Sequence, residues 1–417
     1  MDKRLFNISL ISLLVYELAF IIFSPQGVSI TKLIISCLVW ISLLAGILVF
    51  SKSLRKLRRD FPLLVFLNFL VLIGWNLTAI ARSVIGKDET ITTILGNTYT
   101  SLALLVPFAI VFGTRAANIK LIIGYFNKLL KLGIPISLVF FIIGGVLLEE
   151  NNLRVLLLLL LPVAFLTTLI PFQKPKRIIL ILISGALLMY IALISGVRTM
   201  IIREVLLIGC LFFGVFLFSR FQLKLPLIVF FLFLLVPLYL LQEGVKTGVS
   251  PFEKYLSGTT DDNLSTDTRT FLYVELFEDL MVNERFLIGK GATGKYYSPY
   301  FASFEGDSSM RINVEVGVLS ILLKSGFVGV LLHMSMLITA IFLAFFKSNN
   351  LFVIGSGFIL LIHSILMFIE NIIIYNTYNF AIWFFVGVCL SQRIREANNQ
   401  DIWDLINGKQ RRALPNE

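Results

Sequence analysis

Charged residues are scarce in this sequence. Only 15% of its 417 residues are Asp, Glu, Lys or Arg, whereas 57% are hydrophobic, and the mean hydropathy is +0.90. A soluble globular protein carries far more charge than this. Because a membrane-spanning helix needs about 20 mostly apolar residues, the composition predicts a polytopic membrane protein with room for about a dozen helices and no soluble domain.

Cysteine and histidine are also rare. The three cysteines all lie inside apolar runs, so no disulfide framework is expected in the outer segments: Cys37, Cys210 and Cys389. The two histidines, His333 and His363, also fall within apolar runs, where we expect packing or polar bridging. The outer segments contain no histidine or carboxylate cluster with metal-ligand spacing, because Asp261-Asp262 has no nearby partner motif. We therefore expect no metal and no cofactor.

Twelve apolar runs are candidate spans. They cover approximately residues 5–23, 30–50, 61–81, 99–114, 132–148, 153–172, 178–196, 200–218, 226–242, 317–346, 351–370 and 378–391. If the amino terminus is cytoplasmic, more than half of the 36 basic residues fall in segments on the cytoplasmic side. This is the positive-inside pattern, with both termini in the cytoplasm. The net charge of +11 therefore reports topology and does not indicate a nucleic-acid partner.

The runs divide the chain into four parts. Residues 1–242 hold the first nine predicted helices, 243–316 form one large outer loop, 317–391 hold the last three helices, and 392–417 form a cytoplasmic tail without a core of its own. Long loops between spans usually carry function. The outer loop is slightly acidic, so an arginine that works there must be an individually placed charge.

Three features stand out within this loop. An amphipathic helix is predicted from near Arg269, with the apolar stripe Phe271, Val274, Phe277 and Met281, either on the membrane face or packed against the spans. The glycine-rich segment 289–294 resembles a phosphate cradle but lacks the strand before it and the helix after it that such a loop requires. An aromatic patch follows, suited to stacking on sugar rings or to interfacial anchoring: Tyr296, Tyr297, Tyr300, Phe301 and Phe304.

Ionisable residues at membrane boundaries supply the candidate chemistry. Arg198 lies in the short turn between the seventh and eighth spans, and Arg203 lies about 7.5 Å deeper if the chain is helical. These arginines either bind an anion, or snorkel to headgroups and pair with a carboxylate. Glu315 begins a helical spacing that continues through Leu319, Leu322, Gly326 and Gly329. Partly desolvated at the head of that face, it is either a general base or the salt-bridge partner of Arg311 or Lys324.

Together these elements resemble the bacterial O-antigen polymerase and O-antigen ligase superfamily. The resemblance covers residues 150–390 and rests on the twelve spans, the single large loop before the tenth span, the arginine-bearing turn 195–199, and the order Arg269, Gly289 to Gly294, Glu315 and Gly326-Phe327-Val328-Gly329. In the ligase branch a histidine stands eleven residues before the first glycine of the last element. Glu315 occupies that position here, which favours the polymerase branch.

The resemblance implies an all-α membrane protein of the glycosyltransferase C-type (GT-C) architecture in the bacterial inner membrane, with its active site on the outer face. It implies polymerisation of polyprenyl (undecaprenyl) pyrophosphate-linked repeat units into O-antigen, capsule or exopolysaccharide, with inversion at the anomeric carbon and without a metal. Partners would be the lipid-linked donor and acceptor glycans, the bilayer and a chain-length regulator protein. The pyrophosphate would be bound by arginines: Arg198, Arg203, Arg269 and Arg311. Glu315, or Asp267 as second choice, would act as base, and Tyr296, Tyr297 and Tyr300 would contact glycan.

Three alternatives remain open at this point. An O-antigen ligase would transfer the glycan to a lipid A-core acceptor. A lipid-linked oligosaccharide flippase or another transporter also has about twelve spans, and prolines within the runs could break helices around a midplane site. A scaffold for envelope assembly is the third.

Overall fold

The computed structural model describes residues 7–8, 10–15, 17, 57–58, 60–85, 97–143, 160, 162–167, 175–194, 270–300, 310–312, 314–371 and 375–407. Within these ranges the chain is mostly helical, with one two-stranded antiparallel ribbon. The helices are α3 (Leu63–Ile85), α5 (Thr98–Gly113), α6 (Ala116–Ile143), α8 (Pro162–Thr167), α9 (Pro175–Ile194), α14 (Thr270–Val282), α16 (Gly317–Phe346), α17 (Leu351–Leu366), α18 (Thr377–Leu390), α19 (Gln392–Glu396) and α20 (Asn399–Asn407). The ribbon pairs β1 (Tyr296–Tyr297) with β2 (Met310–Arg311).

Apolar helices dominate the described part of the chain. Three of them are long and apolar enough to cross a bilayer, over Leu63–Val84, Ala116–Val139 and Gly317–Phe346, and four shorter apolar helices accompany them. Large apolar side chains also cover outer surfaces, as on α3, where Leu64 is 80% exposed and Val71 53% exposed. Contiguous exposed apolar surface of this kind is rare on soluble monomers. The architecture fits an all-α protein embedded in a membrane.

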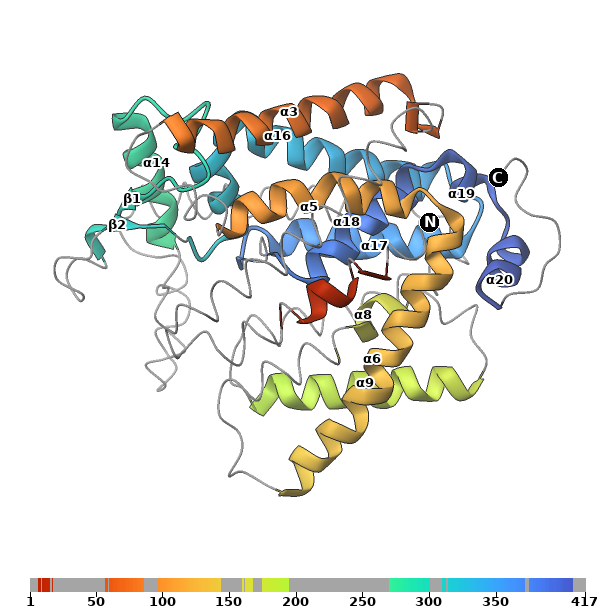
Figure 1. Cartoon of the computed structure of the whole chain (residues 1–417). Helices are drawn as coiled ribbons and strands as arrows, with labels where there is room; N and C mark the ends of the chain where they lie inside the picture. The colour runs from red at the N-terminus through yellow and green to blue at the C-terminus, as the bar shows by residue number, and fades with distance from the viewer. Residues whose placement is uncertain are drawn as a thin grey trace.

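The centre of the bundle is a close contact between α5 and α18. A Cβ added at Gly113 would lie 1.9 Å from the carbonyl oxygen of Phe384, and one added at Gly387 would lie 2.1 Å from that of Ile110. Glycine at both positions therefore lets the two backbones touch, as small residues do between membrane helices. Around this pair, α16 packs against α3, α17 and α18 (Figure 1).

Six of the twelve helices predicted from apolar runs are confirmed as helices. The runs 61–81, 99–114, 178–196, 317–346, 351–370 and 378–391 correspond to α3, α5, α9, α16, α17 and α18. The runs 30–50, 200–218 and 226–242 lie outside the described residues, and 5–23 and 153–172 are described in part.

The prediction was wrong for the fifth run. Residues 115–131 were expected as a connection and 132–148 as a span, yet α6 runs without interruption from Ala116 to Ile143. Lys120 and Lys128 lie on this helix and are exposed. A cationic side chain that faces outward does not end a helix, because lysine is a good helix former.

The segment from α19 to α20 packs onto the bundle. Ile394 of α19 and both Ile402 and Ile406 of α20 are buried in the main hydrophobic cluster. The Asn350 side chain donates hydrogen bonds to the carbonyl oxygens of Ile394 (2.8 Å) and Ala397 (2.9 Å). This segment lies at one end of the bundle, and α14 with β1 and β2 lies at the opposite end (Figure 1).

Candidate active site

Helix α14 lies in the expected outer loop and packs against α16. The predicted helix is confirmed, and it begins at Thr270. Its buried stripe, however, is Leu272, Leu276 and Leu280, whereas Met281 of the expected stripe is 63% exposed. The buried leucines pack against the first turns of α16, so this face of α14 is turned toward a span and not toward lipid.

The glycine-rich segment 289–294 does not form a phosphate cradle. Its amides are already engaged: Lys290 N–H donates to the Leu323 carbonyl (2.8 Å), and Gly291 N–H donates to the Lys324 carbonyl (3.0 Å). Ala292 N–H donates to Ala79 of α3 (3.1 Å). A cradle requires backbone N–H groups that point at the ligand. Here these groups join the loop to α3 and α16 instead.

The loop contacts α16 where that helix is broken. Gly326 has φ 72° and ψ −176°, far from helical values, and a Cβ there would lie 2.3 Å from the Leu287 carbonyl oxygen. Phe327 N–H donates to Phe286 (2.9 Å), and Val328 N–H donates to Leu287 (3.2 Å). Backbone groups freed inside a membrane helix must find new partners. The loop supplies them on one side of the break.

Helix α3 completes the support of the break. Trp75 donates its indole N–H to the Ser325 carbonyl at 2.7 Å. Arg82 donates to the Ile288 carbonyl at 2.5 Å and lies over the Trp75 ring, 5.7 Å from its centre. Helix α3 and the loop around Ile288, which are more than 200 residues apart in the sequence, thus meet at the break in α16.

A buried lysine joins the loop to the beginning of α16. Lys324 is only 4% exposed, and its ammonium donates to the carbonyls of Gly294 (2.6 Å) and Ile312 (2.8 Å). From the sequence, Lys324 was expected only as a salt-bridge partner of Glu315. A single cation inside a long apolar run was the signal for a structural role, since such residues are costly unless they are paired.

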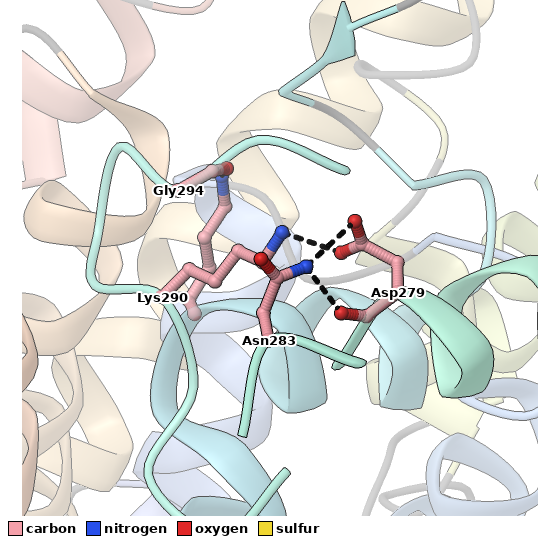
Figure 2. A network of polar contacts seen from close by, with 5 residues as sticks. Asp279, Asn283, Lys290 and Gly294 are labelled. Atoms are coloured by element: carbon pink, nitrogen blue, oxygen red, sulfur yellow. Dashed lines mark hydrogen bonds and ion pairs between the residues drawn. The ribbon is translucent and has the colours of Figure 1, made fainter. Parts of the chain in front are cut away.

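A network on α14 fixes the glycine-rich segment from its other side. The Asp279 carboxylate forms an ion pair with Lys290 at 2.5 Å. Asn283 donates to the Asp279 backbone and side chain, at 2.6 Å and 3.3 Å (Figure 2). These contacts hold the turn that follows α14 against the loop.

The aromatic patch lies on the β1–β2 ribbon and the residues after it. Tyr296 pairs with Arg311 across the ribbon and is 1% exposed, whereas Tyr297 is 48% exposed. Burial raises the pKa of Tyr296 to about 12, although the charge of Arg311 opposes that rise. Tyr300 stacks on Phe271 with ring centres 4.1 Å apart. Tyr297 and Tyr300 therefore present ring surface outward, and Tyr296 is a core residue.

A carboxylate of α14 organises this patch. Glu275 accepts hydrogen bonds from the Ser298 hydroxyl (2.6 Å) and from Tyr300 N–H (3.0 Å). Tyr273, two residues earlier, donates from its hydroxyl to the Phe368 carbonyl at 2.7 Å, and burial raises the pKa of Tyr273. The patch is thus tied to α14, and α14 is tied to the segment after α17.

Glu315 lies just before α16 and not on it. The helix begins at Gly317, and its N-cap, Val316, is extended, with φ −118° and ψ 127°. The continuous helical face expected from Glu315 to Gly329 is therefore wrong in two places, because Glu315 precedes the helix and Gly326 breaks it. Glu315 is exposed, in contrast to the expected partial desolvation, and it has no hydrogen bond or ion pair among the described residues. The alternative salt bridge of Glu315 to Arg311 or Lys324 is therefore not formed among the described residues.

The structure brings part of the expected site together. Arg311, Glu275 and Glu315 all act electrostatically on Tyr296, so these three charges lie near one side chain. Arg198, Arg203, Asp267 and Arg269 lie outside the described residues. Phe301 and Phe304 of the aromatic patch, and Asp261-Asp262, lie outside them as well.

Glu370 is a neighbour that the sequence analysis missed. Its backbone carbonyl accepts the N–H of Gly317 at 3.1 Å, and that of Met367 accepts the N–H of Val318 at 2.9 Å. Glu370 is half-buried. Its signal in the sequence is a lone carboxylate at the end of an apolar run. The start of α16 is therefore surrounded by residues from α14, the ribbon and the segment 367–370.

The histidines and the described cysteine pack inside the bundle. His333 shares a hydrogen bond with the Gly329 carbonyl at 2.8 Å and lies edge-on to Trp383. His363 lies 3.3 Å from the Tyr378 hydroxyl, and Cys389 is buried in α18. Within the described ranges, no three His, Cys, Asp or Glu side chains lie together as a metal site would require.

No protein-family model matches this chain, and no curated protein matches it either.

Proposed function

We propose that the chain is a membrane glycosyltransferase that polymerises polyprenyl (undecaprenyl) pyrophosphate-linked repeat units into a polysaccharide on the outer face of the bacterial inner membrane. The observation that carries the proposal is the exposed Glu315 carboxylate, without a hydrogen bond among the described residues. It lies at the start of a candidate membrane span, α16, and close enough to Arg311 that both charges act on Tyr296. The twelve-span topology and the GT-C architecture are part of this proposal.

Glu315 is the general base in this reaction. The hydroxyl of the acceptor sugar gives its proton to the Glu315 carboxylate, and its oxygen forms a bond to the anomeric carbon of the donor glycan. The bond from that carbon to the pyrophosphate oxygen breaks, so polyprenyl pyrophosphate leaves with the bonding electron pair. Attack opposite the leaving group inverts the anomeric centre. A positioned base typically contributes about 10²- to 10⁴-fold in rate.

Arginines stabilise the charge that develops on the pyrophosphate. Arg311 lies on β2, and both its charge and that of Glu315 act on Tyr296. Arg198, Arg203 and Arg269 complete the anion site in the proposal, because a guanidinium binds phosphate oxygens through two parallel hydrogen bonds. Such donors act on a leaving anion as a metal ion would in other enzymes.

The exposed tyrosines are suited to the sugar part of the substrate. Tyr297 and Tyr300 present their rings beside the ribbon, and Glu275 fixes the backbone of Tyr300 at 3.0 Å. A ring held in one orientation can stack on a sugar face with little loss of side-chain entropy. Because the aromatic patch is tied to α14, and α14 packs against the first turns of α16, the glycan would be held near the start of a span.

The geometry of the broken helix favours an enzyme over a flippase. Transporters bind their substrates with the free backbone groups of broken helices. In α16 the groups flanking Gly326 are already used, since Phe327 and Val328 donate to the loop and Ser325 accepts from Trp75. An O-antigen ligase stays the second candidate, and Glu315 in the histidine position argues against it.

A comparison of two glutamates tests the proposal. Glu315→Gln keeps the shape of the side chain but removes the base, so elongation of labelled polyprenyl pyrophosphate repeat units by the purified protein should fall about 10²-fold or more. Glu278→Gln is the matched control, because Glu278 is exposed on α14 of the same loop, and its rate should equal the parental rate. Equal elongation by a correctly inserted Glu315→Gln protein would remove Glu315 as the base.

A further inference from the structure

A cavity of about 1020 Å³ opens at the end of the bundle away from α14. The amino-terminal segment, with Asn7 and Ile11, forms one wall, and the face of α6 from Ala116 to Leu132 forms another. Arg393 of α19 closes a third side. Because the proposed active site lies at the opposite end of the molecule (Figure 1), this cavity is separate from it.

Positive charge dominates the lining of the cavity. The lining includes one carboxylate, Asp60, and four cationic side chains: Arg115, Lys120, Lys128 and Arg393. Helix α6 also begins at the cavity, where Ala116 and Ala117 line it, and a helix N-terminus adds partial positive charge to what the side chains already provide. The cavity is therefore complementary to an anion.

The same cavity has an apolar side. Leu121, Leu129 and Leu132 follow one another along α6, and Ile11 belongs to the amino-terminal wall. Leu132 is 57% exposed, and Ile11 is 58% exposed. A soluble anion would leave Leu132 and Ile11 uncovered in the cavity, whereas an amphiphile would cover them.

The position of the lysines also calls for an anionic partner. Lys120 and Lys128 both lie inside Ala116–Val139, one of the candidate membrane spans. A cation at membrane depth is costly unless it faces a polar cavity or a counter-charge. Basic pockets between membrane helices bind the headgroups of acidic lipids for this reason.

We propose that this cavity binds one acidic glycerophospholipid, with its phosphate between Lys120 and Lys128, within the positive field of Arg115 and Arg393, and with its acyl chains against Leu121, Leu129 and Leu132. The bound lipid would join the amino-terminal segment, α6 and α19, which are distant in the sequence. Because a ligand that binds only the folded state stabilises it, the lipid should also raise the temperature of unfolding. The proposal does not depend on the activity of the outer site.

Gly124 provides a direct way to block the site. It lies at the middle of the α6 wall, and a Cβ added there meets nothing within 4 Å. Gly124→Leu should therefore fold normally while its side chain occupies the space of the lipid. Gly74 is a matched control, because it is an exposed glycine inside α3, a Cβ there also meets nothing within 4 Å, and it does not line the cavity.

The experiment measures lipid retained by the full-length protein in a neutral detergent, by native mass spectrometry, as phosphatidylglycerol is added. We expect one phosphatidylglycerol bound by the parental protein and by Gly74→Leu, at least tenfold weaker binding by Gly124→Leu, and no comparable binding of phosphatidylcholine. Equal binding by Gly124→Leu and Gly74→Leu would overturn the proposed location. Equal binding of phosphatidylcholine would overturn the requirement for an acidic headgroup.

Two further arms test the charges and the kind of anion. Lys128→Gln should weaken phosphatidylglycerol binding about fivefold, the usual effect of one lysine next to an anionic lipid. Lys131→Gln should leave binding unchanged, because Lys131 is exposed on the same helix but does not line the cavity. Inorganic phosphate should not displace the lipid at concentrations equal to that of the lipid. Full displacement would show a site for a soluble anion and overturn the lipid assignment.

Discussion

The break in α16 gives a stability prediction that can be worked out from the structure. Gly326 has φ 72° and ψ −176°, a region that only glycine occupies readily, and a side chain forced into it costs about 1–3 kcal/mol. In Gly326→Ala the new Cβ would also lie 2.3 Å from the Leu287 carbonyl oxygen and 2.5 Å from Gly289 N. Both are backbone atoms, so the overpacking adds about 1–3 kcal/mol.

Together these costs predict that Gly326→Ala lowers the free energy of unfolding by about 2–6 kcal/mol. The assay is thermal unfolding of the purified protein in detergent, followed by tryptophan fluorescence, where the midpoint should fall by about 2–7 °C. The control is Gly74→Ala, which lies inside a helix with open space around it and should gain about 0.5–1 kcal/mol. A Gly326→Ala protein as stable as the parent would refute the broken geometry of α16.

Two further predictions concern buried side chains where the loop meets α16. Lys324→Met removes the charged donor to Gly294 and Ile312 and should cost about 2–3 kcal/mol in the same unfolding assay, whereas Lys347→Met, at an exposed lysine, should cost nothing measurable. For Tyr296, whose pKa is raised to about 12, folding favours the neutral phenol, so its contribution to stability should be lost as the pH rises from 10 to about 12. Subtracting the tyrosinate absorbance titration of Tyr296→Phe from that of the parent should give a midpoint near 12, and a midpoint near 10 would contradict the burial.

Hydropathy predicted the apolar helices well because a long apolar run has few other stable conformations in a membrane. It failed on α6, where Lys120 and Lys128 resembled the start of a connection. These lysines line a cavity. The hydropathy of a sequence does not show which face of a helix lines such a cavity. The predicted span therefore began at residue 132, whereas α6 begins at Ala116.

The candidate site was predictable only in part. Composition and spacing located α14, the aromatic residues and Glu315, but helical periodicity wrongly placed Glu315 and Gly326 on one continuous face. Periodicity assumes regular backbone angles, and the positive φ of Gly326 violates that assumption. The role of segment 289–294 depends on hydrogen bonds to α3 and α16, and contacts between segments that lie far apart in the sequence leave no local signature.

Product analysis with the full-length protein in vesicles tests the central claim most directly. Vesicles would receive polyprenyl pyrophosphate that carries a labelled repeat unit, and both the glycan products and the released polyprenyl pyrophosphate would be measured over time. A polymerase predicts a ladder of longer glycans, with one polyprenyl pyrophosphate released for each new bond. Redistribution of intact labelled substrate across the membrane, without elongation or release, would contradict the account.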